Sequence, residues 1–247
     1  MNQEKLLIAK ALCEKNMPKE TIGVQQEKIL HKIIKYLLTK NEAEHEIKIN
    51  KMYIDVMINN HIYEIQTRQF NALRNKLEKL LPTYNVTIVH PIARTKYIYL
   101  LNEYGELIKE SKSPKKGNPF HLLIEQYKIS SYLNNSNLSF KVLLFDIDEY
   151  RTIAPKKHYR SQGYVRLKQI PKELIKIYDF KTVDDYLNIF NEYEFIDDFT
   201  VLDFSKKFKI SYNKAAASIR TLHTLGVIEI KKKEGKKNVW ALKNKKN

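Results

Sequence analysis

The sequence predicts a mixed α/β fold followed by a smaller C-terminal module, because the spacing of apolar residues changes along the chain. Apolar residues recur at helical spacing from Thr21 to Leu38, at strand-like spacing from Glu46 to Gln66, and at helical spacing again from Arg68 to Leu81. Val86 to His90 and Tyr97 to Leu101 then read as buried strands. This order indicates a compact α/β unit with a mixed sheet in about the first half of the chain.

Turn-forming residues divide these elements. The pairs Asn50-Lys51 and Asn59-Asn60 interrupt the strand-like region. Both central residues of a two-residue hairpin turn need positive φ, which asparagine tolerates. Pro82 stops the helix that begins at Arg68. The region is therefore predicted to be a meander of short strands between two helices.

The middle of the chain is predicted to be less regular. Gly105 to Pro119 is a polar stretch typical of a loop or boundary, Phe120 to Tyr132 is predicted to be helical, and Phe140 to Ile147 is a strongly apolar strand. Whether that strand joins the first sheet is open. From Ala154 to Gln169 the chain carries no acid, and it has the hinge-like Gly163. The basic residues of this predicted mobile, DNA-contacting segment are Lys156, Lys157, Arg160, Arg166 and Lys168.

The C-terminal segment has the order of a winged helix-turn-helix domain. Thr200, with Asp203 three residues later, is predicted to cap a first helix, and Ser211 to cap a second that runs to Leu225. Gly226 ends the second helix. Two short strands follow, Val227 to Ile230 and Val239 to Leu242, joined by a basic loop around Gly235.

Charge points to nucleic acid as the partner. The chain has a net charge of +16 and a pI near 9.6. Residues 201–247 hold 13 Lys or Arg and three acids, a net of 13 − 3 = +10. Lysine-rich usage can also reflect an AT-rich genome, but such a bias would not concentrate charge in one segment. The C-terminal module is therefore expected to bind DNA.

Several other classes of protein are disfavoured. Cys13 is the single cysteine, so the chain cannot form an internal disulfide, and no apolar run approaches the roughly 20 residues that cross a bilayer. The start of the chain lacks the pattern of a signal peptide. The histidines have no zinc-site spacing and no glycine-rich phosphate loop is present. We expect a cytoplasmic protein without a membrane partner.

An acidic hairpin is the strongest candidate site. If Asn59-Asn60 is a two-residue turn, paired residues sum to 119, so Asp55 lies opposite Glu64, with β-carbons about 5 Å apart. Gln66 then shares their face. Opposed carboxylates repel, and a hard cation such as Mg²⁺ would remove that cost. The alternative is a solvated face with two ordinary surface acids. Glu27 favours the metal, because it falls on the inward stripe of the preceding helix.

These residues resemble a known superfamily. A helix with an inward Glu, a hairpin reading D-x8-E-x-Q, and then a helix and a strand are similar to the PD-(D/E)xK, or restriction-endonuclease-like, nucleases over Thr21 to Leu101. The resemblance implies that the Asp and Glu hold Mg²⁺, for which Mn²⁺ can substitute, together with a backbone carbonyl, and that a helix acid completes the site. The matching positions are Asp55, Glu64, the carbonyl of Ile65, and Glu27. Gln66 stands where the superfamily usually has a catalytic Lys.

That departure leaves two readings open. Gln66 could orient the attacking water while Mg²⁺ supplies the positive charge, or the domain could have lost catalysis and only bind DNA. Arg68 could replace the missing charge, or be a solvated residue of the first helical turn. The sequence thus predicts a Mg²⁺-dependent DNA endonuclease that hydrolyses phosphodiesters. The alternative is a non-catalytic DNA-binding regulator with a degenerate nuclease fold.

The predicted organisation has three parts: a nuclease core over residues 1–110, a middle segment over 111–195, and a winged helix-turn-helix domain over 196–247. If the last part docks as such domains usually do, its second helix enters the major groove and its wing meets phosphates. The candidate contacts are Asn213, Lys214, Ser218, Arg220, Lys236 and Lys237. Cutting both strands needs two sites, which a homodimer or a larger DNA-processing complex would supply.

Overall fold

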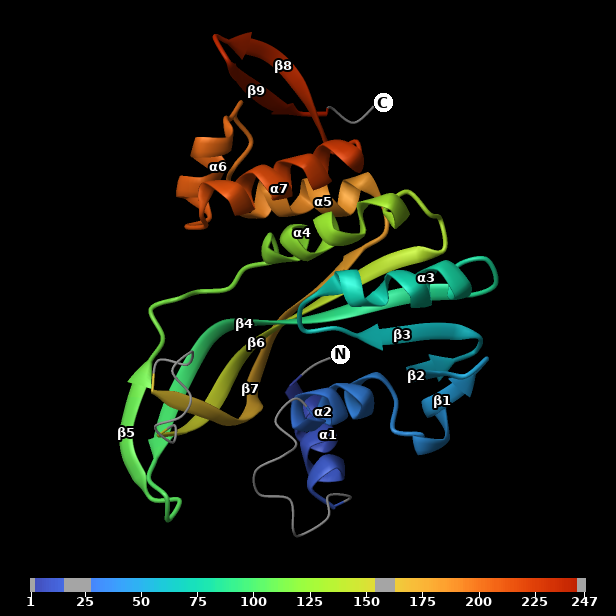
Figure 1. The fold of residues 1–247 in the computed structure, drawn as a ribbon, viewed down its shortest axis with the longest axis vertical. Coiled ribbons are helices and arrows are strands. Elements are labelled where there is room, and N and C mark those ends of the chain that lie inside the picture. The colour runs from blue at the N-terminus through green and yellow to red at the C-terminus, as the bar shows by residue number, and fades with distance from the viewer. Residues whose placement is uncertain (1–2, 16–27, 154–162, 244–247) are drawn as a thin grey trace. The chain divides into compact units, whose positions relative to one another are not determined.

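The computed structural model describes residues 3–15, 28–153 and 163–243 of the 247-residue chain (Figure 1). The helices of these residues are α1 (Gln3–Lys15), α2 (Lys28–Leu38), α3 (Arg74–Leu80), α4 (His121–Gln126), α5 (Val183–Glu192), α6 (Val201–Lys207) and α7 (Tyr212–Thr224). Short 3₁₀ helices are η1 (Glu42–Glu44), η2 (Phe70–Leu73) and η3 (Tyr127–Tyr132). The strands are β1 (His45–Ile49), β2 (Met52–Ile58), β3 (His61–Ile65), β4 (Asn85–Leu101), β5 (Leu107–Lys112), β6 (Leu138–Ile153), β7 (Tyr164–Phe180), β8 (Ile228–Glu234) and β9 (Lys237–Leu242).

Seven strands of the described residues form one mixed sheet. Their order is β1-β2-β3-β4-β6-β7, with β5 paired to β4. β1 and β2 are antiparallel, as are β4 and β5, whereas β3 and β4 are parallel. A parallel pair needs a crossover connection, which η2 and α3 provide between Ile65 and Asn85. The predicted mixed α/β class is confirmed, and the apolar strand over Phe140 to Ile147 belongs to this sheet as part of β6.

Both predicted asparagine turns are confirmed. Asn50 and Lys51 have φ values of 44° and 68°, and Asn59 and Asn60 have φ values of 47° and 65°. Two consecutive residues with positive φ characterise the hairpin turn whose twist matches that of the flanking strands. The turn residues thus mark where β2 begins and ends.

Other element boundaries differ from the predictions. The helix predicted from Arg68 begins later, because Gln69 is left-handed with φ 59° and the chain first forms η2. The strands predicted on either side of Pro91 are one strand, β4, since the fixed φ of proline is compatible with an extended chain. The helix predicted over Phe120 to Tyr132 is split into α4 and η3, with non-helical φ and ψ at Ile129.

The segment from Ala154 to Gln169, predicted to be mobile, is in part a strand. Arg166, Lys168 and Gln169 lie in β7, a 17-residue strand next to β6, so they are held by a sheet rather than in a loop. Sheet pairing outweighs the basic composition on which the prediction depended. The predicted contacts Lys156, Lys157 and Arg160 lie outside the described residues.

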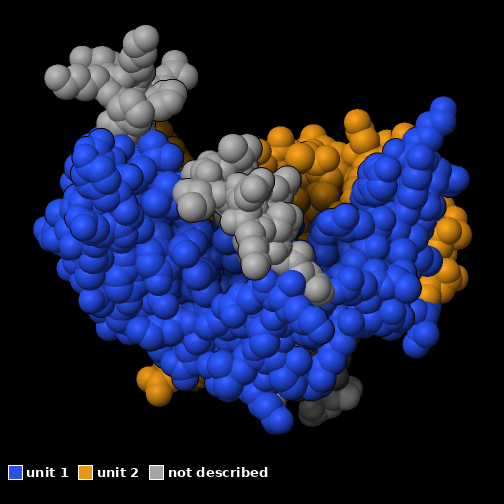
Figure 2. Space-filling view, turned by 90° about the horizontal axis from the view of Figure 1, so that it is seen from below, with its two compact units in different colours: residues 1–59, 91–117, 143–177 blue, residues 60–90, 118–142, 178–247 orange. Residues whose placement is uncertain are grey.

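The chain divides into two compact units, which Figure 2 colours separately. Unit 1 contains residues 1–59, 91–117 and 143–177, and unit 2 contains residues 60–90, 118–142 and 178–247. β4, β6 and β7 each contribute residues to both units. These units differ from the three predicted parts, because the C-terminal helices group with 60–90 and 118–142 and no boundary falls at residue 110 or 195.

Unit 1 has its helical core where α1 packs against α2. The buried side chains of α1 are Leu6, Ala9 and Cys13, while Ile34 of α2 has no exposed surface. Gln3 ties the start of α1 to β7, since its amide donates to the Lys172 carbonyl (3.3 Å) and its oxygen accepts from the Leu174 N–H (3.0 Å). None of the helices in the described residues has the length and apolar character needed to cross a bilayer.

Unit 2 is built around a cluster of aromatic rings. The ring centroids of Phe120 and Phe208 lie 4.0 Å apart, and those of Phe204 and Phe208 lie 4.6 Å apart. Phe120 also meets Phe190 of α5 edge to face at 5.1 Å. Figure 1 shows α4, α5 and α7 side by side. The C-terminal helices therefore share one hydrophobic core with α4 and α5 and do not form a separate core.

Most local signals of the C-terminal segment are confirmed, but Ser211 stands at the N-cap of α7 without a side-chain capping hydrogen bond. Thr200 and Asp203 form a capping box at the start of α6, with the Thr200 N–H donating to an Asp203 carboxylate oxygen at 2.9 Å. Gly226, with φ 72°, follows the end of α7. β8 and β9 are longer than predicted and meet at a tight turn with Gly235 at φ 59°.

We expect Phe204→Ala to lower the free energy of unfolding by about 3–5 kcal/mol, because a fully buried ring would leave a cavity in the aromatic core. Denaturant titration followed by circular dichroism measures this change. Leu202→Ala, at a 43% exposed position of the same helix, is the matched control and should change stability by less than about 1 kcal/mol. Equal effects of the two substitutions would show that the C-terminal helices do not depend on this core.

Candidate functional site

Glu64 is a buried carboxylate with a lysine beside it. It lies on β3 and is 4% exposed, and its Oε2 is 2.7 Å from Nζ of Lys76 on α3. Both partners belong to unit 2. A carboxylate removed from water is stable only when it is paired or hydrogen-bonded. The alternative reading of Glu64 as an ordinary surface acid is therefore wrong.

The apolar pattern of β3 and α3 orients each of these two side chains. β3 is a buried strand in which Ile62 and Ile65 are almost fully covered. α3 buries Leu77 and Leu80, and Lys76 adjoins this apolar stripe. The sequence prediction did not include Lys76. Lys76 precedes the buried Leu80 by four residues, so the two lie on the same side of α3. This helical spacing, which also predicts that Glu27 faces inward, could have identified Lys76.

The backbone after Glu64 is held by hydrogen bonds. The Gln66 N–H donates to the Val89 carbonyl (2.9 Å), and the Gln66 carbonyl lies 2.6 Å from Nδ1 of His90, which donates to it in the neutral ring. The side-chain amide of Gln66 donates to the carbonyl of Arg68 (2.6 Å), while Arg68 itself is exposed. Gln66 is thus anchored on both its main chain and its side chain.

His90 is buried against Phe70, with ring centroids 5.2 Å apart. Burial lowers the pKa of His90, because desolvation disfavours the charged ring, although the hydrogen bond to Gln66 opposes this shift. The neutral imidazole therefore supports the Gln66 carbonyl at neutral pH.

Asp55 also has a lysine from a helix nearby. In unit 1, Lys35 of α2 places Nζ 3.9 Å from the Asp55 carboxylate and 2.7 Å from that of Glu46. The side chain of Lys35 is 11% exposed and that of Asp55 is 24% exposed. The hydrogen bond and charge of Lys35 lower the pKa of Glu46. Each of the two acids of the predicted motif thus has a helix lysine within its own unit.

The predicted metal site as a whole stays a prediction. Asp55 lies in unit 1 and Glu64 and Ile65 in unit 2, whereas Glu27 lies outside the described residues. Within residues 3–15, 28–153 and 163–243, no three acids, histidines or cysteines gather as metal ligands. The predicted donors are two carboxylates and one carbonyl, an all-oxygen set that suits Mg²⁺.

The predicted DNA contacts of the C-terminal segment differ in exposure. Asn213, Lys214, Lys236 and Lys237 are exposed. Arg220 is exposed as well, and it donates to the hydroxyl of Tyr127 (3.1 Å). Ser218 is fully buried and donates to the Lys214 carbonyl (3.0 Å), which corrects its assignment as a DNA contact. It faces the core because Ile219 and Leu222 bury the same side of α7.

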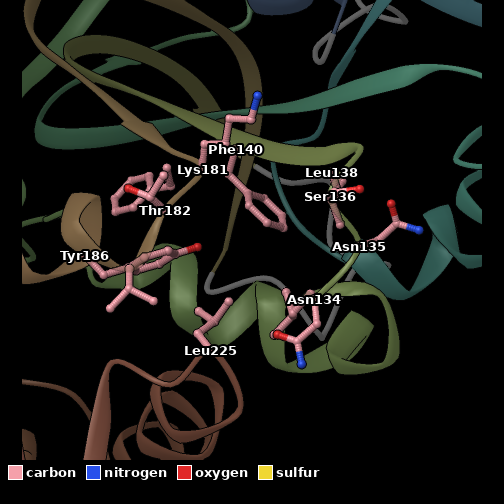
Figure 3. A pocket seen from close by; sticks show the side chains of 12 residues that line it. Asn134, Asn135, Ser136, Leu138, Phe140, Lys181, Thr182, Tyr186 and Leu225 are labelled. Carbon is pink, nitrogen blue, oxygen red and sulfur yellow. The ribbon is translucent and has the colours of Figure 1, made fainter. Parts of the chain in front are cut away.

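Unit 2 also contains a pocket of roughly 390 Å³ (Figure 3). Figure 3 shows Asn134, Asn135 and Leu138 on one side and Thr182 and Tyr186 on the other. The lining has no carboxylate, imidazole or thiol, and its ionisable side chains are Lys181 and Tyr186. Burial raises the pKa of Tyr186, so its hydroxyl stays protonated at neutral pH. The amides of Lys181 and Thr182 at its rim already donate to Asp185, which caps α5. These two N–H groups are therefore not available to a ligand in the pocket.

The chain belongs to the family described as Domain of unknown function (DUF8091), whose model matches residues 28–181. The match includes α2 through β7 and ends just before α5. An uncharacterized protein of Treponema pallidum (strain Nichols) is 32% identical over 124 residues, which cover 50% of this chain and 49% of that protein. The chain thus spans about half the length of that curated relative. No solved structure matches the chain.

We expect Lys76→Met to cost about 3 kcal/mol of stability, because it leaves the Glu64 carboxylate buried without its lysine. Adding Glu64→Gln to this variant should recover part of the loss, since no charge then remains buried at the pair. Chemical unfolding of the single and double variants measures the coupling. Lys79→Met, at an exposed position of the same helix, is the control, and an equal loss in both single variants would contradict the pairing.

Stability should fall as the pH drops below about 6.5. His90 has a lowered pKa in the folded protein, so the unfolded chain binds the proton more tightly. The stabilisation is present above the ordinary histidine pKa and is lost at lower pH, by up to about 1.4 kcal/mol per pH unit. Burial shifts the pKa of His61 and His121 in the same direction.

Denaturant unfolding between about pH 7.5 and about pH 5 measures this slope. His90→Gln should make the slope shallower, and His223→Gln, at an exposed position, should leave it unchanged. An identical slope in wild type and His90→Gln would rule out His90 as a source of the pH dependence.

Proposed function

We propose that this DUF8091 protein is a Mg²⁺-dependent DNA endonuclease of the restriction-endonuclease-like type. The observation that carries the proposal is the buried Glu64–Lys76 pair, with 2.7 Å between Oε2 and Nζ. The resembled motif usually combines its carboxylates with a lysine, and this chain has Gln66 at that position. Lys76 supplies the missing ammonium group from the following helix.

The order of elements supports the same assignment. α2, the β1-β2-β3 meander, α3 and β4 follow one another along the chain, and β3 is parallel to β4. This is the order that the resemblance implies for a nuclease core: a helix, a hairpin with the acids, a crossover helix and a strand. The family match from residue 28 to residue 181 includes all of these elements.

The residues present suit the chemistry of phosphodiester hydrolysis. Asp55, Glu64 and the Ile65 carbonyl would hold Mg²⁺, which when bound lowers the pKa of a bound water and neutralises phosphate charge. The Lys76 ammonium group has three donors, and it would hold the attacking water or a phosphate oxygen beside Glu64. Gln66, fixed by the Val89, His90 and Arg68 contacts, would keep the Ile65 carbonyl in place.

The C-terminal segment is proposed to act as a winged helix-turn-helix domain. α6, α7 and the β8–β9 hairpin follow in the order of that fold, and Phe199 pairs with Trp240 of β9. Asn213 and Lys214 on α7, and Lys236 and Lys237 at the hairpin tip, are exposed. With a net charge of +10 in residues 201–247, this surface suits the phosphates of DNA.

Incubating the full-length protein with supercoiled plasmid and Mg²⁺ tests the proposed activity. We expect nicking that EDTA abolishes, and a loss of about 100-fold or more in Asp55→Asn, Glu64→Gln and Lys76→Gln. Glu78→Gln and Lys79→Gln on the exposed side of α3 make the same charge changes and should retain activity.

The outcome of this assay also separates the two functions. If neither Mg²⁺ nor Mn²⁺ supports cleavage while the protein still binds DNA, the nuclease proposal fails and a non-catalytic DNA-binding regulator stands. If Lys76→Gln cleaves as well as Lys79→Gln, Lys76 is structural. It then does not replace the lysine that the motif usually has at the position of Gln66.

A further inference from the structure

A second buried carboxylate, in unit 1, lies among several cations. Glu149 of β6 is 1% exposed. Its oxygens accept from Nε of Arg151 (2.7 Å) and from the amide of Gln169 (2.5 Å), and Nζ of Lys96 lies 3.3 Å away. Nε of Arg166 lies 3.6 Å away. β4, β6 and β7 thus each contribute a cation to one acid.

The cluster has more positive charge than one carboxylate can compensate. Lys96, Arg151 and Arg166 carry three charges against one on Glu149, a net of 3 − 1 = +2. A carboxylate offers about four acceptor positions, whereas an arginine has five N–H donors and a lysine three. Most donors of the cluster are therefore available to a second anion. The cation side chains are 32%, 30% and 39% exposed, so a ligand can reach them.

Nearby acids do not cancel this excess. Asp146 is held by Arg94 through two hydrogen bonds of 2.9 and 2.7 Å. Asp148 lies 3.9 Å from Nζ of Lys172 and accepts from the Tyr99 hydroxyl at 3.4 Å. The charge of the cations lowers the pKa of Glu149 despite its burial, so it remains an anion at neutral pH. Glu149 holds three cations together that would otherwise repel one another.

We propose that Lys96, Arg151 and Arg166 form a binding site for a phosphodiester of a nucleic-acid strand, with Glu149 as the positioning residue. The proposal rests on the proposed function only in taking nucleic acid as the source of the phosphate, and it needs no cleavage. Arginine presents a planar fork that matches phosphate oxygens, and cations on neighbouring strands can follow a backbone. A free phosphate dianion shares this chemistry, and competition with inorganic phosphate separates the two sources.

The test is binding of a labelled single-stranded oligonucleotide to the full-length protein in EDTA, followed by fluorescence anisotropy at several salt concentrations. The variant Arg151→Gln/Arg166→Gln should bind about tenfold more weakly. Its salt slope should also be smaller, by roughly 0.7 for each phosphate that the variant no longer neutralises. The control with the same charge change is a double variant of exposed β5 and α3 lysines, Lys109→Gln/Lys79→Gln.

Glu149→Gln separates positioning from overall charge, because the two effects change the oligonucleotide affinity in opposite directions. The substitution makes the protein more positive, so charge alone predicts tighter binding. Loss of positioning predicts that Glu149→Gln binds the oligonucleotide about threefold more weakly. Adding Glu149→Gln to a variant that already lacks the cations should weaken binding no further. Glu110→Gln, exposed on β5, makes the same charge change and should bind as tightly as wild type or slightly more tightly.

Each outcome decides for or against the site. Binding by the double cluster variant equal to that of its control would overturn it, as would tighter binding by Glu149→Gln. Saturation by inorganic phosphate, with oligonucleotide affinity independent of length, would assign the site to a small phosphorylated ligand and overturn the nucleic-acid source.

If a cluster variant does not fold in a thermal melt, Lys96→Gln and Arg166→Lys replace it. Binding without plasmid cleavage would overturn the nuclease function and leave this site standing.

Discussion

A carboxylate buried in a sheet must be compensated by a cation or by hydrogen bonds, and this requirement shapes the charged parts of the fold. The buried acids among the described residues are Glu64, Asp146 and Glu149. Each has a lysine or an arginine within ion-pair distance, supplied by another element or by the same strand. The strands and helices around these acids are therefore positioned by charge as well as by apolar packing.

The same pairing connects stability with the proposed chemistry. Lys76 compensates Glu64 and is also the ammonium group that we propose for the nuclease site, so its structural and proposed catalytic roles depend on one contact. At Glu149 the compensation exceeds the charge of the acid, and the surplus is what makes the cluster attractive to phosphate. The family match over residues 28–181 includes Glu64 and Glu149, but the family has no described function. The proposed roles of these two acids therefore rest on their contacts.

The C-terminal segment shows how a local pattern and a tertiary core can diverge. Its capping residues, turn glycine and strand order follow the pattern expected from the sequence. Its core, however, includes Phe120 and Phe190, which lie far away in the sequence. In this packing Ser218 of α7 is buried, whereas Asn213 and Lys214 are exposed. Which residues of α7 are exposed is therefore decided by unit 2 as a whole.

The sequence by itself determined the features that depend on neighbouring residues. The asparagine turns, the capping box at Thr200, the mixed α/β class and the identity of the candidate acids all follow from local backbone preference and spacing. Only the tertiary structure decided which cation meets which acid, because Lys76 and Glu64 are 12 residues apart and meet through a crossover. It also placed Arg166 in a strand beside Glu149, since pairing between distant strands outweighs local composition.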